Sequence, residues 1–352
     1  MRTALRSIGV VLGVVLAGLI AFFFWASSSR VPDEALAQVT QYDAPDTPPP
    51  DTLTATTYNL GYLSGMTNNK PVVRPESLFT NNMNRAAGLL GRSSPDVVGL
   101  QEVDFGAARS FDVHQLDTLA TRLGSATAAQ AVNWDVRYLP FPYGRPAVHF
   151  GRVLSGQGVL SQLPIRAHRR YVLPSPPQPF YRSAFYLDRL AQVTLLDWSD
   201  RPLVVINVHL EAYDTATREN QARQVRTLYN QVAQPGVPIL LLGDFNAELD
   251  APDDSTMALL LDDTALRPAY PDSAAQAAAP TFPADTPTRT IDHILYSTNA
   301  FEQTSRAVRC GAPPPPSDHC AVTTSLVLDS ISAPSLDSVH ARLPPAGPLP
   351  AN

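Results

Sequence analysis

Carboxylates and histidines stand at or just after the ends of short apolar runs at widely separated points of the sequence. Glu102 follows residues 96–100, His209 follows residues 203–208, and Asp244 comes soon after another such run. A carboxylate at the end of a buried strand is costly unless a cation or hydrogen bonds compensate it. Carboxylate oxygens bind hard divalent cations, and histidine donates hydrogen bonds or moves protons near neutral pH. These residues therefore predict a site for metal-assisted or acid–base chemistry.

Two further pairs strengthen this prediction. Asp244 and Asn246 are two residues apart, so on an extended segment both side chains point to the same side. Asp318 and His319 are adjacent, and on a loop they can approach one site from different angles. Each residue alone has an ordinary explanation: a turn at Asp244, a satisfied core histidine at His209, a helix cap at Asp318. Their joint occurrence at the ends of separate strands favours a functional site.

The elements that must position these residues are short strands and a few helices. Apolar runs of four to six residues predict strands at 53–58, 96–100, 203–208, 237–242 and 290–296. Helical periodicity is clearest over 81–92 and 215–232, the latter behind the candidate caps Asp214 and Thr215. The 34 prolines must lie mainly in loops such as 174–179, 268–287 and 313–316. This mixture predicts an α/β fold, a four-layered αββα sandwich of two packed mixed sheets flanked by helices.

The chain divides into four predicted segments. Residues 1–30 form an N-terminal helix, 31–51 a Pro-rich linker, 52–329 the folded domain, and 330–352 a Ser/Ala/Pro-rich tail that we expect to be disordered. With 44% hydrophobic residues, the 352-residue chain has enough apolar material for one substantial core.

The N-terminal segment predicts a membrane anchor. Residues 8–26 are all apolar or glycine, and Arg2 and Arg6 precede them. Such a helix is about 28 Å long, close to the thickness of a bilayer core. We expect an uncleaved signal anchor, oriented with its N-terminus in the cytoplasm and the domain periplasmic or on the cell surface. The alternative is a cleaved signal peptide and a secreted domain.

The charge balance and the cysteine content exclude or disfavour several classes of protein. After residue 30 the chain carries 32 acidic against 23 basic residues, which gives little support to generic DNA affinity. The best basic cluster, Arg166, Arg169 and Arg170 beside Tyr171, is more typical of a solvated face. The two cysteines, Cys310 and Cys320, exclude a cysteine-ligated zinc module. They have two open interpretations: a disulfide formed outside the cytoplasm, or two small buried apolar residues.

Six segments resemble the successive motifs of the endonuclease/exonuclease/phosphatase superfamily, in family order over about 270 residues. They are Thr57–Gly61, Gly99–Val103, Asn207–Leu210, Leu242–Asn246, Thr290–Leu295 and Ser317–Val322. The resemblance implies the αββα sandwich and the hydrolysis of a phosphoric ester. The superfamily includes deoxyribonucleases, apurinic endonucleases, neutral sphingomyelinases and inositol polyphosphate phosphatases.

The resemblance also implies a role for each polar residue. Asn59, Glu102 and Asp318 match metal-site positions, with Mg²⁺ as the expected ion and Mn²⁺ as an alternative. The other matches surround the scissile phosphate: Asp244 and Asn246 orient the attacking water and the phosphate, His209 and His319 flank the phosphate, and Asp292 buttresses His319. Water is then the nucleophile in an in-line attack, and either Asp244 or His319 removes its proton.

The substrate is the least determined property. Gly156–Ser161 departs from the family pattern, with Gln157 as a candidate phosphate contact and Gly158 at a close backbone approach. The anchor, the acidic domain and a similarity of Leu210–Asp214 to sphingomyelinase-like members favour a lipid or other membrane-proximal phosphodiester. The alternatives are an extracytoplasmic nuclease acting on nucleic acid and a non-catalytic binding module that keeps the fold.

Overall fold

The computed structural model describes residues 2–43, 48–269, 279–329 and 334–349. In this part of the chain two seven-stranded sheets pack face to face. The first has the order β1–β4–β5–β3–β2–β13–β12: β1 (Ala37–Gln41), β4 (Thr127–Leu139), β5 (Gly151–Ser161), β3 (Val97–Asp104), β2 (Thr52–Asn59), β13 (Ala321–Leu328) and β12 (Phe301–Arg309). The second has the order β10–β11–β9–β8–β7–β6–β14: β10 (Leu266–Pro268), β11 (Asp292–Ser297), β9 (Ile239–Asp244), β8 (Arg201–His209), β7 (Arg189–Trp198), β6 (Ile165–Leu173) and β14 (Gly347–Pro348).

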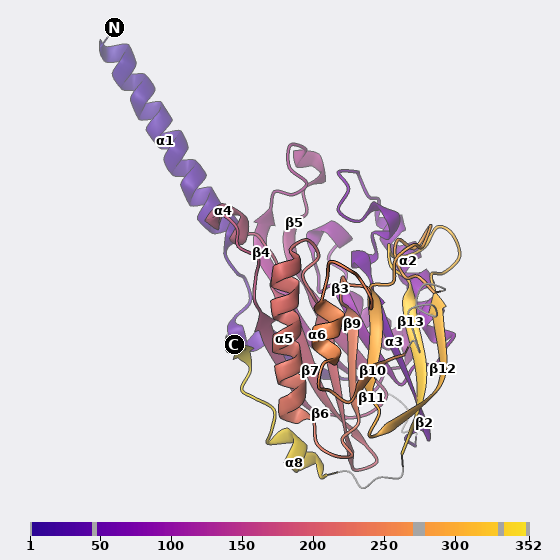
Figure 1. Cartoon of the computed structure of the whole chain (residues 1–352). Helices are drawn as coiled ribbons and strands as arrows, with labels where there is room; N and C mark the ends of the chain where they lie inside the picture. The colour runs from indigo at the N-terminus through magenta and orange to yellow at the C-terminus, as the bar shows by residue number, and fades with distance from the viewer. Residues whose placement is uncertain (1, 44–47, 270–278, 330–333, 350–352) are drawn as a thin grey trace.

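Helices cover the outer faces of both sheets (Figure 1). The helices are α1 (Arg2–Ser27), α2 (Glu76–Gly91), α3 (Gln115–Leu123), α4 (Phe180–Ser183), α5 (Thr215–Val232), α6 (Thr256–Leu261) and α8 (Leu336–His340). The buried faces of α2 and α3 share an apolar cluster with the first sheet, and those of α5 and α6 share one with the second. A third cluster, including Leu53, Val97, Val205 and Leu242, fills the space between the sheets. The four-layered αββα sandwich is confirmed.

The predicted elements occur close to their expected positions. All five predicted strands are present, and α5 begins at Thr215 with the Asp214 carboxylate accepting the Thr217 amide at 2.7 Å. Helix α2 begins five residues earlier than the periodicity indicated, directly after Pro75. Proline is tolerated at a helix start because no intrahelical bond needs its missing N–H. The predicted loop 268–287 lies partly outside the described residues.

Strand directions bring the polar residues to one end of the sandwich. β2 runs parallel to β3, and β8 runs parallel to β9, so the carboxyl ends of each pair lie side by side. In register, His209 is opposite Asp244, and Asp244 is opposite Asp292 on antiparallel β11. We call this the catalytic end of the sandwich. Gly243 lets β8 and β9 approach there, because its φ is +147° and a Cβ would lie 1.9 Å from the Val208 carbonyl oxygen.

Two segments that were expected to be unstructured join the sheets. Residues 37–41 of the predicted linker form edge strand β1, paired antiparallel with β4. In the predicted disordered tail, the described residues 334–349 form α8 and β14, and β14 pairs with β6. Val339 is fully buried in the core of the second sheet, and the Tyr171 hydroxyl donates to the Pro344 carbonyl at 2.7 Å. The low overall hydrophobicity of both segments indicated that they would be unstructured, whereas a few individual contacts are enough to attach them to the sheets.

Helix α1 projects from the body beside α4 (Figure 1). It is long and apolar enough to cross a membrane, and its most hydropathic 18-residue window is not buried in the protein. Its last turn nevertheless contacts the domain: the Phe23 ring meets Phe180 and Phe185, with centroids 5.9 and 5.6 Å away. Just beyond the helix, the Asp135 carboxylate accepts the backbone amides of Arg30 and Val31 at 2.6 and 2.8 Å. These contacts fix the direction in which the helix leaves the domain.

Candidate active site

Asp244 lies at the centre of the polar cluster at the catalytic end. Its Oδ2 accepts a hydrogen bond from Asn59 Nδ2 at 2.9 Å and lies 3.5 Å from His209 Nε2 and 3.8 Å from His319 Nε2. Its Oδ1 accepts the backbone amide of Asn246 at 2.9 Å. Asn246 itself adopts a left-handed conformation with φ of 52°, and its Nδ2 donates to the Leu210 carbonyl. Two histidines therefore flank one buried carboxylate.

His319 is held by a second carboxylate behind it. Its Nδ1 donates to Asp292 at 3.0 and 3.2 Å from the two oxygens, which directs Nε2 towards Asp244. The loop that carries His319 is tied to β2, because the Ser317 hydroxyl donates to the Asn59 carbonyl at 2.7 Å and accepts the His319 amide. The Phe282 ring packs 4.8 Å from the imidazole. The arrangement selects one ring orientation, with a proton on Nδ1.

The two histidines differ in charge because their neighbours differ. Burial opposes protonation of His319, but Asp292 and Asp244 outweigh it and raise its pKa well above the usual value. Burial, Arg189 and His319 lower the pKa of His209 well below the usual value. Burial raises the pKa of Asp244, and His319 partly offsets this. At neutral pH the site therefore presents an imidazolium and a neutral imidazole on either side of Asp244.

Glu102 and Asp318 form a second acidic group beside this one. The Asn68 Nδ2 donates to Glu102 Oε2 at 2.9 Å and lies 3.3 Å from Asp318 Oδ2. Burial and the charge of Asp318 raise the pKa of Glu102 to about 7. Glu102 also has a φ of 51°, an uncommon conformation for a residue with a Cβ, and conformations of this kind cluster at functional sites. Two buried or half-buried carboxylates therefore share one amide donor.

The residues present fit a divalent cation. Glu102, Asp318 and Asn59 provide oxygen ligands, which Mg²⁺ prefers. The Asn68 Oδ1 is buried with no hydrogen-bond partner, so this amide also has an unsatisfied oxygen beside the two carboxylates. Asp244, Asp292 and His319 form another group whose potential ligand atoms lie within 4.8 Å of one another. In that group Asp292 and Asp244 keep His319 protonated, so its ring nitrogens cannot ligate a cation and the oxygen set around Glu102 suits the cation better.

The structure thus brings together the eight residues for which the sequence predicted a catalytic or metal-binding role: Asn59, Glu102, His209, Asp244, Asn246, Asp292, Asp318 and His319. Sequence reasoning missed Asn68, which lies on the loop after β2, and Arg189, the first residue of β7. Arg189 Nε donates to buried Glu211 at 3.3 Å, and the Tyr186 hydroxyl donates to the same carboxylate. Its Nη1 is buried without a hydrogen-bond partner. The sequence signal that could have identified Arg189 is a single arginine directly before an apolar run that predicts a strand.

Three other sequence interpretations have clear outcomes. Gln157 is fully buried between the sheets, where its Nε2 donates to the Asn207 carbonyl at 3.0 Å, so its proposed contact with a phosphate is wrong. Alternation along β5 directs this side chain into the interface between the sheets. In the basic cluster, Arg166 pairs with Asp197 and Arg170 with Asp188. The cysteines form the disulfide Cys310–Cys320, which closes the loop carrying Asp318 and His319.

Comparison with known proteins agrees with this geometry. The sequence model of the endonuclease/exonuclease/phosphatase family matches residues 56–319, a range that contains every residue of the cluster. Fold and site together define a phosphoric ester hydrolase of the four-layered sandwich class. The chain belongs to the endonuclease/exonuclease/phosphatase family, whose members are metal-dependent enzymes of this class. No curated protein matches the chain.

Solved structures share the fold at low sequence identity. A family member from Beutenbergia cavernae is 23% identical with a TM-score of 0.58, over 79% of this chain and 72% of that one. The human Nocturnin catalytic domain with bound sulfate is 17% identical with a TM-score of 0.57, over 85% of this chain and all of that one. A Bacteroides thetaiotaomicron family member is 18% identical with a TM-score of 0.54, over 79% and 98%. At these identities the likeness concerns the fold alone.

Proposed function

We propose that this chain is a Mg²⁺-dependent phosphodiesterase that uses water as its nucleophile, with Mn²⁺ as an alternative ion, and acts on a membrane-proximal or lipid phosphodiester outside the cytoplasm. The observation that carries the chemistry is the placement of Asp244 between a protonated and a neutral histidine, beside the oxygen ligands of Glu102 and Asp318. In-line hydrolysis needs a water acceptor, donors to the phosphoryl oxygens and a cation.

Each residue then has a definite task. The Asp244 carboxylate, with Asn246 beside it, orients the water and accepts its proton. His319, kept protonated by Asp292, donates to a non-bridging phosphoryl oxygen, whose negative charge grows in the transition state. His209 donates from a neutral ring on the other side. Arg189 adds a fixed positive charge through its unpaired Nη1. Asn59, Glu102 and Asp318 would hold Mg²⁺, which supplies Lewis-acid stabilisation of the phosphoryl and leaving oxygens.

The membrane and compartment assignments rest on separate observations. Helix α1 is long and apolar enough to span a bilayer. The Cys310–Cys320 disulfide is typical of oxidising compartments, which supports a periplasmic or cell-surface domain. Arg2 and Arg6 precede the helix, which supports an N-in orientation.

The test is an assay of the full chain in mixed detergent–lipid micelles, with Mg²⁺, with Mn²⁺ and with EDTA. The substrates are sphingomyelin, glycerophospholipids, single- and double-stranded DNA, and a chromogenic phosphodiester. We expect metal-dependent turnover of lipid and of the chromogenic ester. Asp244→Asn and His319→Gln should each lower turnover by about 10²–10⁴-fold, while exposed Asp262→Asn should not. Turnover of DNA alone would show a nuclease, and inactivity with either metal would show a binding module.

A further inference from the structure

Large apolar side chains that are exposed on the domain gather at one end. Among the described residues outside α1, every exposed large apolar side chain except Val39 lies on a connection between strands at the catalytic end. The six most exposed of these form what we call the apolar rim: Val73, Phe111, Tyr143, Phe180, Tyr181 and Tyr213. Tyr213 is 87% exposed, Val73 78% and Phe180 75%. Single exposed apolar residues are common on soluble proteins, but their concentration at one end indicates a contact surface.

Topology places these residues at one end although they come from five different connections between strands. Val73 follows β2, Phe111 follows β3 and Tyr213 follows β8, the strands that end in or beside the catalytic residues. Tyr143 lies between β4 and β5, and Phe180 and Tyr181 lie between β6 and β7. Strands β5 and β7 run antiparallel to β3 and β8, so both begin at the same end. The rim residues therefore lie at the same end of the sandwich as the catalytic residues.

Contacts between loops hold parts of the rim in place. Arg145 Nη1 donates to the Pro71 carbonyl at 3.0 Å, which joins the loop of Tyr143 to the loop of Val73. The Phe111 ring packs 5.8 Å from Phe79 of α2. On the other side, Phe180 contacts Phe23 of α1. The rim is thus continuous with the end of the membrane-crossing candidate.

Helix α1 leaves the domain from this same end (Figure 1). Its last turns contact α4 and the end of β4, and the Phe22 ring lies 5.9 Å from Tyr138. Phe24 and Trp25 are 65% and 52% exposed at the point where the helix meets the domain. Aromatic residues at the end of a membrane span are typical of the headgroup level of a bilayer. A bilayer containing α1 would meet the domain at its catalytic end.

We propose that the apolar rim is a membrane-contact surface that lies in the headgroup layer of the bilayer spanned by α1. Tyrosine and phenylalanine favour this interface because their rings are apolar and, in tyrosine, the hydroxyl stays hydrated. The rim would hold the catalytic end against the lipid, so the site would receive phosphodiesters from the headgroup layer. This consequence for the substrate rests on the proposed function, whereas the contact itself does not.

The contact is tested without any activity measurement. The only two cysteines are joined in a disulfide, so single variants Val73→Cys, Tyr181→Cys and Tyr213→Cys can be labelled with an environment-sensitive NBD fluorophore. Val39→Cys is the matched control, because Val39 is an exposed apolar residue of edge strand β1 and pairs opposite Ala129, away from the catalytic end. The full-length proteins are reconstituted into phosphatidylcholine vesicles and exposed to aqueous iodide or to headgroup-region nitroxide lipids.

We expect the rim probes to shift their emission to the blue, to be quenched by the nitroxide lipids and to be shielded from iodide. The Val39→Cys probe should remain accessible to iodide. Rim probes as accessible to iodide as the control would overturn the proposal. Shielding that instead depends on protein concentration in detergent would assign the rim to contacts between copies of the chain, and would also overturn it.

An activity measurement separates this proposal from the proposed function. The triple variant Val73→Ser/Tyr181→Ser/Tyr213→Ser should lose at least tenfold in kcat/KM on phosphodiester lipids in vesicles and keep its rate on a soluble chromogenic phosphodiester. Equal rates of the variant and the natural chain on vesicle lipids would contradict a role of the rim in presenting lipid. If the natural chain does not hydrolyse the soluble phosphodiester at all, the proposed function is contradicted, whatever the fluorescence of the probes shows.

Discussion

The pairing of His319 with Asp292 makes a sharp prediction at the scale of single residues. Asp292→Asn removes the carboxylate that stabilises the imidazolium, so turnover should fall by about 10²-fold or more. The pKa of His319 should fall as well, so the alkaline limb of the pH–rate profile should move to lower pH. The measurement is kcat/KM from pH 6 to 10 on a soluble phosphodiester. A lower rate with an unmoved alkaline limb would show that Asp292 does not control His319.

Protonation of Glu102 predicts how metal binding depends on pH. In the metal-free protein its pKa is raised to about 7, so the folded state retains a proton there that the unfolded chain loses near its usual pKa of 4.5. Stability from this group therefore decreases as pH rises from about 4.5 to 7, and cation binding must displace the remaining proton.

We expect Mg²⁺ affinity, measured by calorimetry, to rise by up to about tenfold from pH 6 to pH 8. Glu102→Gln removes the titrating group and should flatten this dependence while weakening binding overall. Affinity that is independent of pH in the natural chain would place the ion away from Glu102.

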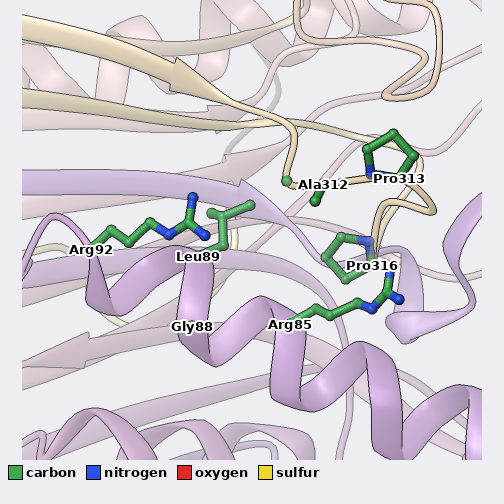
Figure 2. Close-up of a pocket in the computed structure, with 8 residues that line it drawn as sticks. Arg85, Gly88, Leu89, Arg92, Ala312, Pro313 and Pro316 are labelled. Atoms are coloured by element: carbon green, nitrogen blue, oxygen red, sulfur yellow. The ribbon is translucent and has the colours of Figure 1, made fainter.

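At the scale of elements, the loop closed by Cys310 and Cys320 determines where Asp318 and His319 lie. Helix α2 supports this loop from behind: Arg85 and Leu89 face Pro313 and Pro316 across a small pocket (Figure 2). Arg85 also donates to the Pro314 carbonyl. Helix α2 and the disulfide, which are distant in sequence, therefore both position the loop that carries Asp318 and His319.

Removing the disulfide should affect both stability and activity. By the chain-entropy relation, Cys310→Ala/Cys320→Ala should cost about 3 kcal/mol of unfolding free energy. Turnover should fall as well, because His319 directly precedes Cys320. Urea unfolding and a soluble-substrate assay measure the two effects. Reductant should cause the same losses of stability and turnover in the natural chain and should not affect the double variant. If reductant changes neither property of the natural chain, the disulfide does not have this role.

At the scale of the whole molecule, the docking of α1 predicts a difference between soluble and membrane-bound substrates. Residues 31–352 keep β1, both sheets and the complete polar cluster, so the truncated protein should hydrolyse a soluble phosphodiester at the rate of the full chain. On vesicle lipids it should lose about 10²-fold, because the anchor raises the local substrate concentration. Equal loss on both substrates would indicate that α1 supports the fold of the site itself.

Much of this molecule could be predicted from local sequence. Polar residues that follow apolar runs, such as Glu102, His209 and Asp244, lie at strand ends because the apolar run must be buried and the polar residue must not be buried alone. The same periodicity located α5 and predicted two sheets between helices. The long apolar run near the N-terminus indicated a membrane-crossing helix by its length alone.

Only the tertiary structure decided which of these residues meet and in what electrical state. Burial lowers the pKa of both histidines; Arg189 lowers the pKa of His209 further, whereas Asp292 and Asp244 raise that of His319. These three charged residues belong to different strands and act through space. The recruitment of Asn68, the ordering of residues 334–349 and the pairing of the cysteines depend on neighbours brought close by sheet register. The direction of α1 relative to the catalytic end likewise depends on Phe23 reaching Phe180 and Phe185. The local pattern of apolar and polar residues determines which side chains are buried. The distances between residues that are remote in sequence are determined only when the sheets and helices pack together.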